Sequence, residues 1–328
     1  MKYLGNKTRL AEFLSDVMNL QSRKGQKSLD LFAGTGAVSY LFKSHDMNTV
    51  SNDLLSFSSH RVRSILRDRE PARIQKLETE KTQGFITENY SEKIDVNIFK
   101  VNIAKHIDGA RIHLDNIKHN LTEQEFSYYL SQIIEAADFR SNIMGSYESF
   151  YKAGWRKQCE KAWSIEDFKL IDNQGKTTHK VFNKEALDFL KDTDELYDLI
   201  YLDPPYNTRQ YSSVFHVLET ISTYDNPEVS GKVKKSVKLK KKNSNLCSKV
   251  RCLQHFQNII EESSKKTNDI FISYSNEGIL DVQQIESILY SFFKHVTIEE
   301  YEYRKFKTNS RKPNNSNKVK EYLINGKK

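Results

Sequence analysis

The sequence is short of cysteine and has no long apolar run. Its 3 cysteines, Cys159, Cys247 and Cys252, lack the spacing of a metal site, so we expect free thiols and no bound metal. No apolar run approaches the ~20 residues that a membrane span needs. The N-terminus also lacks the apolar segment of a signal peptide. These absences predict a cytoplasmic protein without a membrane partner.

The charge of the chain is concentrated in two short segments. Residues 230–252 carry nine Lys or Arg and no acid, and residues 303–328 carry nine more with a single acid, Glu321. The rest of the chain is acidic, although the net charge is +8. Basic segments of this kind suit a polyanion, because neutralised phosphates release their condensed counterions. With 38% hydrophobic and 29% charged residues, the chain is typical of one large globular domain, or of one domain with an insertion.

A glycine turn follows the first predicted strand. Residues 28–36 read Ser-Leu-Asp-Leu-Phe-Ala-Gly-Thr-Gly and lead into a helical pattern over 37–42. Glycines in such a turn let the backbone approach a ligand at the carboxyl edge of a parallel sheet. A second strand over 48–52 delivers Asp53 to that edge, where an acid suits a ribose diol. Ser39 stands where a dinucleotide-binding fingerprint needs its third glycine, so the pattern does not favour a nicotinamide or flavin site.

The apolar run 199–202 ends in Asp203, Pro204, Pro205 and Tyr206. An amine on a nucleobase is a poor nucleophile, because its lone pair is delocalised into the ring. The Asp203 carboxylate and the Pro204 carbonyl can both accept its N–H groups and localise that pair, and the two prolines remove competing backbone donors. Tyr206 offers a face for stacking the base. The alternative is an ordinary tight turn at the end of a strand.

Together these motifs resemble a known family. The stretch 203–211, Asp-Pro-Pro-Tyr-Asn-Thr-Arg-Gln-Tyr, continued through 216–219, and the N-terminal 2–7, Lys-Tyr-Leu-Gly-Asn-Lys, are similar to motifs of the Dam-like, group-alpha adenine-specific DNA methyltransferases. Within that family, the stretch 203–219 is most similar to the FokI-type modification enzymes. The resemblance implies a doubly wound, mostly parallel α/β methyltransferase sheet with a terminal antiparallel hairpin, S-adenosyl-L-methionine as cofactor, and double-stranded DNA as substrate.

Carried over by position, the resemblance also implies the residues that hold the cofactor. They are Tyr3, Lys7, Asp30, Phe32, Ala33, Gly34, Gly36, Asp53 and Asp203. Lys7 would pair with the cofactor carboxylate; alternatively it is a solvated lysine that opens a helix over 8–18. Either Asn183 or Glu185 would contact the cofactor adenine, and both could instead cap the helix that follows.

The rest of the resemblance assigns regions. Residues 1–67 and 179–328 would form the catalytic domain, and 68–178 an inserted, mainly helical target-recognition region with a helix over 123–137. Candidates for reading base edges there are Arg140, Asn142, Arg156, Lys157 and Gln158, although any helical surface carries such residues. Further helices are predicted over 214–224, 250–266 and 281–293. Strands are predicted over 269–274, 296–303 and 318–323, with a basic loop at 308–317.

The lysine-rich run, residues 232–242, lies one helix beyond Tyr206 and would close over DNA. We expect it to lack fixed structure without a partner; the alternative is a solvated loop. Arg209 and Tyr211 are expected to hold the phosphate and sugar of the flipped nucleotide. The predicted DNA contacts in the run are Lys232, Lys234, Lys235, Lys238, Lys240, Lys241 and Lys242.

The predicted reaction is methyl transfer to the exocyclic amine of an adenine flipped out of duplex DNA. By resemblance the enzyme would be the modification arm of a restriction-modification system, whose partner would be a cognate endonuclease. One alternative is a methyltransferase acting on a cytosine amine, on RNA or on a protein glutamine. The other is a non-catalytic DNA-binding specificity protein with the same fold.

Overall fold

The fold is built on a mixed sheet. In the computed structural model, which describes residues 7–67, 80–165, 177–304 and 318–328, the strand order is β3-β2-β1-β4-β7-β9-β8. The described strands of this sheet pair in parallel, except at β9, which is antiparallel to both of its neighbours. The predicted doubly wound sheet with a terminal antiparallel hairpin is therefore confirmed. The strands are β1 (Lys27–Asp30), β2 (Asn48–Asn52), β3 (His179–Phe182), β4 (Leu199–Leu202), β7 (Asp269–Ser275), β8 (His295–Arg304) and β9 (Lys318–Lys327).

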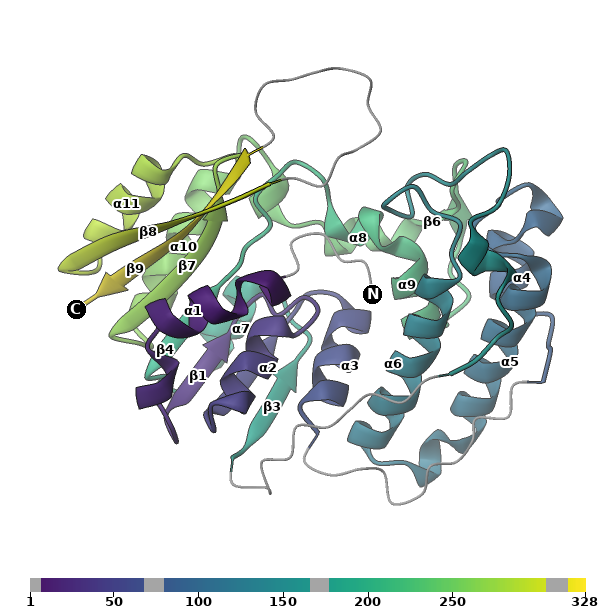
Figure 1. The fold of residues 1–328 in the computed structure, drawn as a ribbon, viewed down its shortest axis with the longest axis horizontal. Coiled ribbons are helices and arrows are strands. Elements are labelled where there is room, and N and C mark those ends of the chain that lie inside the picture. Colours follow the sequence, from purple (N-terminus) through teal and green to yellow (C-terminus); the bar gives the residue numbers. More distant parts are fainter. Residues whose placement is uncertain (1–6, 68–79, 166–176, 305–317) are drawn as a thin grey trace.

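Helices cover both faces of the sheet (Figure 1). All four residues of β4 are buried, as expected for a central parallel strand. Because side chains alternate between faces, Ile200 and Leu202 pack into one apolar core, and Leu199 and Tyr201 into another. The first core is covered by α7 (Ala186–Asp192), α10 (Cys252–Ser264) and α11 (Val282–Tyr290). The second is covered by α1 (Ala11–Val17) and α2 (Ala37–Ser44).

A third core joins the predicted insertion to the catalytic part. It is formed by α3 (Ser56–Ile65), α4 (Phe85–Tyr90), α5 (Val101–Ile117), α6 (Glu123–Phe139), α8 (Tyr211–Val214) and α9 (His216–Thr223). In Figure 1 these helices stand to one side of the sheet, with α3 next to it. Helices α3 and α6 pack along each other, and Arg63 of α3 lies 3.0 Å from Glu123 of α6. Residues before, within and after 68–178 thus share one apolar interior.

Local sequence signals account for most element boundaries. The Thr122 side chain and Glu125 form a capping box at the start of α6, and the predicted helix over 123–137 extends to Phe139. The helix predicted over 214–224 was wrong in detail, because Phe215 leaves the helical conformation and separates α8 from α9. The helix predicted over 8–18 is a 3-10 turn, η1 (Lys7–Leu10), followed by α1. The remaining 3-10 helices among the described residues are η2 (Leu20–Ser22), η3 (Glu92–Ile94), η4 (Lys118–Asn120), η5 (Lys157–Glu160), η6 (Val237–Lys242) and η7 (Asn245–Cys247).

The lysine-rich run has fixed structure, so that expectation was wrong. Its strand β6 (Lys235–Ser236) pairs with β5 (Val229–Ser230), which directly precedes the run. The run then continues as η6. Its backbone is held by buried side chains: the Tyr90 hydroxyl donates to the Lys234 carbonyl at 2.9 Å, and the His216 ring lies 2.7 Å from the Val233 carbonyl. Hydrogen bonds from the neighbouring helices fix this segment, and a reading of its composition does not reveal them.

Candidate active site

A pocket lies at the point where the strand order of the sheet reverses. Strands β2 and β4 flank β1 on opposite sides, and in sheets of this type the crevice at the carboxyl ends of such strands binds ligands. The pocket encloses about 930 Å³ of empty space, part of it open to solvent. Asp30, Asp53 and Asp203, which end or follow β1, β2 and β4, all line it. The reversal therefore brings three carboxylates from distant parts of the chain to one cavity.

The glycine turn and Asp53 form one hydrogen-bonded unit. The Gly34 amide donates to one Asp53 oxygen at 2.8 Å, and the Leu55 amide donates to the other at 2.8 Å. Gly34 and Gly36 both have positive φ, which favours glycine, and a Cβ on Gly36 would lie 2.5 Å from the Ile65 side chain. Burial raises the pKa of Asp53 to about 6 despite the two amide donors. The glycine turn thus holds the Asp53 carboxylate beside a stretch of backbone that can face a ligand.

Asp30 has an oxygen with no partner in the described part of the chain. Ser39 donates to the Oδ2 of Asp30 at 2.6 Å, whereas Oδ1 is buried without a hydrogen bond. Burial raises the pKa of Asp30 to about 7, and the Ser39 hydroxyl opposes that rise. Ser39, which replaces a fingerprint glycine, therefore anchors the acid. A buried, unpartnered carboxylate oxygen at a pocket wall is suited to a cationic or hydrogen-donating ligand.

The turn after β4 places Tyr206 in the same pocket as Asp53. Pro205 and Tyr206 line it together with Asp203, whereas Pro204 is buried. The Tyr206 ring lies 6.3 Å from the Tyr274 ring at 70°, an edge-on contact that fixes its position. One cavity is thus lined both by the turn after β4 and by the glycine turn with Asp53.

Lys7 contacts two carboxylates of the chain. Its ammonium lies 3.1 Å from Oδ1 of Asp203 and forms a short ion pair with Glu321 of β9. Burial disfavours the Lys7 ammonium, but the charges of Asp203 and Glu321 outweigh burial and raise its pKa. Burial also raises the pKa of Asp203 to about 7, while Lys7 opposes and Glu321 adds to that rise. Sequence reasoning missed Glu321, although it stands out as the single acid among nine basic residues in 303–328.

The other predicted cofactor residues divide between the pocket wall and its support. Phe32, Ala33 and Gly34 line the cavity, and Gly36 shapes the turn behind it. Tyr3 lies outside the described residues.

The two residues left open for the cofactor adenine take different positions. Glu185 lines the pocket, caps α7 by accepting the Leu187 and Asp188 amides, and pairs with His255 at 3.1 Å. Asn183 donates to the Asp53 carbonyl at 2.8 Å and is not part of the wall. Glu185 therefore caps the helix, as its alternative predicted, whereas Asn183 does not cap it and binds the loop after β2 instead.

Three of the predicted DNA contacts form ion pairs with acids of the chain. Glu148, from the 68–178 region, lies 3.0 Å from Arg209 and 2.7 Å from Lys235. Lys238 lies 2.6 Å from Asp225. Tyr211 lines the pocket. Lys232 and Lys241 are exposed, and Lys234 is partly buried. Lys240 belongs to η6, but its side chain is not described.

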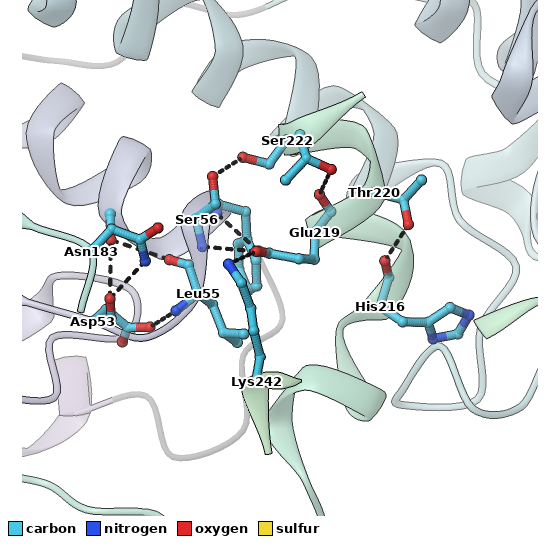
Figure 2. A network of polar contacts seen from close by, with 12 residues as sticks. Asp53, Leu55, Ser56, Asn183, His216, Glu219, Thr220, Ser222 and Lys242 are labelled. Atoms are coloured by element: carbon cyan, nitrogen blue, oxygen red, sulfur yellow. Dashed lines mark hydrogen bonds and ion pairs between the residues drawn. The ribbon is translucent and has the colours of Figure 1, made fainter. Parts of the chain in front are cut away.

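Lys242 differs from the other described lysines of the lysine-rich run, since it lines the cavity. Its ammonium lies 2.6 Å from Glu219, whose two oxygens also accept the backbone amides of Ser56 and Phe57 at 3.1 and 3.2 Å. Figure 2 shows Lys242 reaching Glu219 beside Asp53 and Leu55. The end of the lysine-rich run is therefore joined to the first turn of α3.

Two of the candidates for reading bases point inward. Arg140 is 4% exposed and donates to the carbonyls of Ala136 and Ala162, and Asn142 is fully buried with donors on three carbonyls. As placed, neither can reach a base edge, which corrects their assignment as candidates. Their polar groups bind backbone because the loop around them has no regular strand to satisfy it.

Cys159, Cys247 and Cys252 are free and buried, as expected. Among the described residues no group of His, Cys, Asp or Glu could hold a metal ion. No helix in these same stretches is long and apolar enough to cross a membrane.

Comparison with known proteins adds an independent finding. The family model of the D12 class N6 adenine-specific DNA methyltransferases matches residues 3–288. The chain is 31% identical to the type II methyltransferase M.NlaIII of Neisseria lactamica, over 98% of both proteins. It is 29% identical to the modification methylase LlaI of Lactococcus lactis subsp. lactis and 32% identical to the type II methyltransferase M.FokI of Planomicrobium okeanokoites. It covers 55% and 52% of these two, about half their length. The chain therefore belongs to the D12 class N6 adenine-specific DNA methyltransferase family.

Proposed function

We propose that this chain transfers a methyl group from S-adenosyl-L-methionine to the exocyclic amine of an adenine flipped out of double-stranded DNA. The observation that carries the proposal is the single cavity lined by Asp53 and the glycine turn at one end and by Asp203, Pro205 and Tyr206 at the other. A methyl donor and an acceptor base must share one cavity, because the reaction requires them in contact.

The residues present fit a sulfonium cofactor. The unpartnered Asp30 oxygen and the Asp203 carboxylate are the negative groups a cationic ligand would need. Asp53, already held by two backbone amides, would accept the ribose hydroxyls. The bound cofactor supplies an activated methyl group. The chain's own work is then to orient both substrates and to exclude water.

The acceptor end is suited to a purine amine. Asp203 and the Pro204 carbonyl would accept its two N–H groups, and Tyr206 would stack on the ring, a contact worth roughly 1–3 kcal/mol. Because that amine is engaged in a base pair within duplex DNA, the base must leave the helix first. Arg209 and the lysine-rich run would hold the DNA backbone, and 68–178 would form the target-recognition region.

The biological role proposed is the modification arm of a restriction-modification system. The three relatives named above are called modification methylases or type II methyltransferases, which supports that role here. A cognate endonuclease would recognise the same DNA sequence as this chain.

The test is expression of the chain in bacteria that lack DNA methylation, followed by sequencing of their DNA for modified bases. We expect N6-methyladenine at one recurring sequence, and its loss with Asp203→Ala. Incubation of the purified chain with labelled cofactor and duplex DNA, followed by hydrolysis to nucleosides, identifies the acceptor. Label in N4-methylcytosine, in RNA or in protein alone would overturn the proposal, as would cofactor binding without any transfer.

A further inference from the structure

Glu321 contacts Lys7, a residue of the pocket wall, although it belongs to the C-terminal hairpin. It pairs with Ser275 in the register of β9 against β7 and is 3% exposed. Ser273, on the same face of β7, donates to its Oε1 at 2.7 Å, and the Lys7 ammonium contacts that same oxygen. Two donors on one carboxylate oxygen fix its position, so Glu321 is built into the site.

The charges of this cluster do not cancel. One ammonium, on Lys7, lies between two carboxylates, those of Asp203 and Glu321. With Asp203 ionised, Lys7 and Asp203 alone would be a neutral pair, and Glu321 gives the cluster an excess of one negative charge. Because the cluster is buried, little water screens this charge, and it interacts strongly with a charged group of a ligand in the pocket. A group that only stabilised the fold could have been an uncharged one.

The reaction of the proposed function changes charge at one atom. The C–S bond breaks with its electron pair remaining on sulfur, a C–N bond forms, and one amine proton passes to solvent. The donor enters with a positive sulfur and leaves as a neutral thioether. A negative cluster in the pocket therefore favours binding of the positively charged donor over binding of its neutral product.

We propose that Glu321 is a positioning residue that holds Lys7 against Asp203 and supplies the negative charge by which the pocket prefers the sulfonium cofactor to its neutral thioether product. This inference rests on the proposed use of S-adenosyl-L-methionine. It assigns Lys7 a role within the chain's own charge cluster. It also gives the terminal hairpin a part in the site in addition to closing the sheet.

The experiment measures binding of S-adenosyl-L-methionine and of S-adenosylhomocysteine to the full chain by calorimetry, and uses the ratio of the two affinities. Both ligands share every group except the charged methyl, so the ratio isolates the sulfonium. With Glu321→Gln, we expect the preference for the methylated ligand to fall at least about fivefold, because the cluster becomes neutral. Glu300→Gln is the control: it removes an exposed acid of the same hairpin, one that pairs with Lys320 at 2.8 Å. The ratio should not change there.

A second variant keeps the test decisive if Glu321→Gln fails to fold. The double variant Lys7→Met with Glu321→Gln removes both partners of a buried pair, a change that folds tolerate far better than the loss of one. Asp203 then carries the excess negative charge alone, so we expect the affinity ratio to stay within about twofold of the unaltered chain.

The pH dependence supplies an independent readout. The Glu321 charge adds to the rise of the Asp203 pKa, so Glu321→Gln should move the acid limb of cofactor binding to lower pH. An unchanged ratio in Glu321→Gln overturns the inference, as does an equal loss of both affinities or a collapsed ratio in the double variant. If the unaltered chain binds neither ligand, the proposed function itself has failed.

Discussion

The Lys242 ammonium lies 2.6 Å from Glu219, and this contact joins the lysine-rich run to the wall of the pocket. Glu219 is 2% exposed and also accepts the two backbone amides that open α3 (Figure 2). Helix α3 begins just after Asp53, the acid expected at the ribose. A basic segment expected on DNA and a helix expected beside the cofactor are thus held by one carboxylate.

Replacing Lys242 with methionine should destabilise the protein. It leaves the buried Glu219 carboxylate without its cation, which costs about 2–4 kcal/mol for a pair of this burial. Urea unfolding would measure the change. Lys241→Met is the matched control, because Lys241 is exposed, and it should shift stability by less than about 0.5 kcal/mol. Adding Glu219→Gln to Lys242→Met should recover part of the loss. Equal effects of the two lysine variants would refute the role of the pair.

Cofactor binding should strengthen as pH rises through about 7. Burial raises the pKa of Asp30 and of Asp203 to about 7, so both carboxyls are largely protonated in the free protein below that pH. A cationic ligand favours their ionised forms, and affinity should rise by up to about tenfold per pH unit for each carboxyl until pH 7 is passed. Calorimetry between pH 5.5 and 8.5, chosen as roughly centred on those pKa values, gives the profile. Asp30→Asn should weaken binding and flatten that profile.

The stability of the free protein should have the opposite pH dependence. Both carboxyls have pKa values raised above 3.8, the ordinary value that an aspartate keeps in the unfolded chain. Their contribution to stability is fully present below about pH 3.8 and is lost as pH rises through about 7. We therefore expect the melting temperature to fall over about pH 4–7, the window between the unfolded and the folded pKa values, and less so in Asp30→Asn. A melting temperature that rises over that window in the unaltered chain, but not in Asp30→Asn, would contradict the assignment.

Glu148→Gln should increase affinity for duplex DNA. In the free protein Glu148 pairs with Arg209 and Lys235, two predicted phosphate contacts, and DNA must displace it. We expect a gain of about threefold to tenfold and a steeper dependence on salt, since each freed cation adds about one to the slope of log affinity against log salt. Fluorescence anisotropy at several salt concentrations measures both quantities. Glu88→Gln, which removes an exposed acid bonded to Lys93, is the control. A loss of affinity in Glu148→Gln would rule out competition with phosphate.

Gly278→Ala should lower the rate of methyl transfer more than the affinity for the cofactor. A Cβ at Gly278 would lie 2.1 Å from the Tyr274 ring, which cannot remain in place. Tyr274 packs edge-on against Tyr206, so displacement of its ring removes the support of the expected stacking face. We expect a fall in kcat of about tenfold or more. Steady-state kinetics with calorimetry of the cofactor would separate the two effects. Unchanged kcat would mean that Tyr206 does not depend on Tyr274.

Local patterns in the chain were enough to predict the sheet and the motifs at its edge. The strand predicted over 48–52 and the apolar run 199–202 match β2 and β4, and the glycine turn indicated a strand before it, since these signals depend on neighbours along the chain. The lysine-rich run misled for the same reason. Its composition predicted no fixed structure, whereas its backbone is held by Tyr90 and His216 from distant helices.

What the sequence alone determined is the class of chemistry: an acid, two prolines and an aromatic after one strand, and a glycine turn with a second acid beside another. What only the tertiary structure decided is which charges meet. Glu321 reaches Lys7 because β9 inserts antiparallel beside β7, and Lys242 reaches Glu219 of α9 because η6 packs against α8, the helix that precedes α9. Such ion pairs join residues far apart in the chain, and their strength depends on burial. A local sequence pattern shows neither which distant residues meet nor how deeply they are buried.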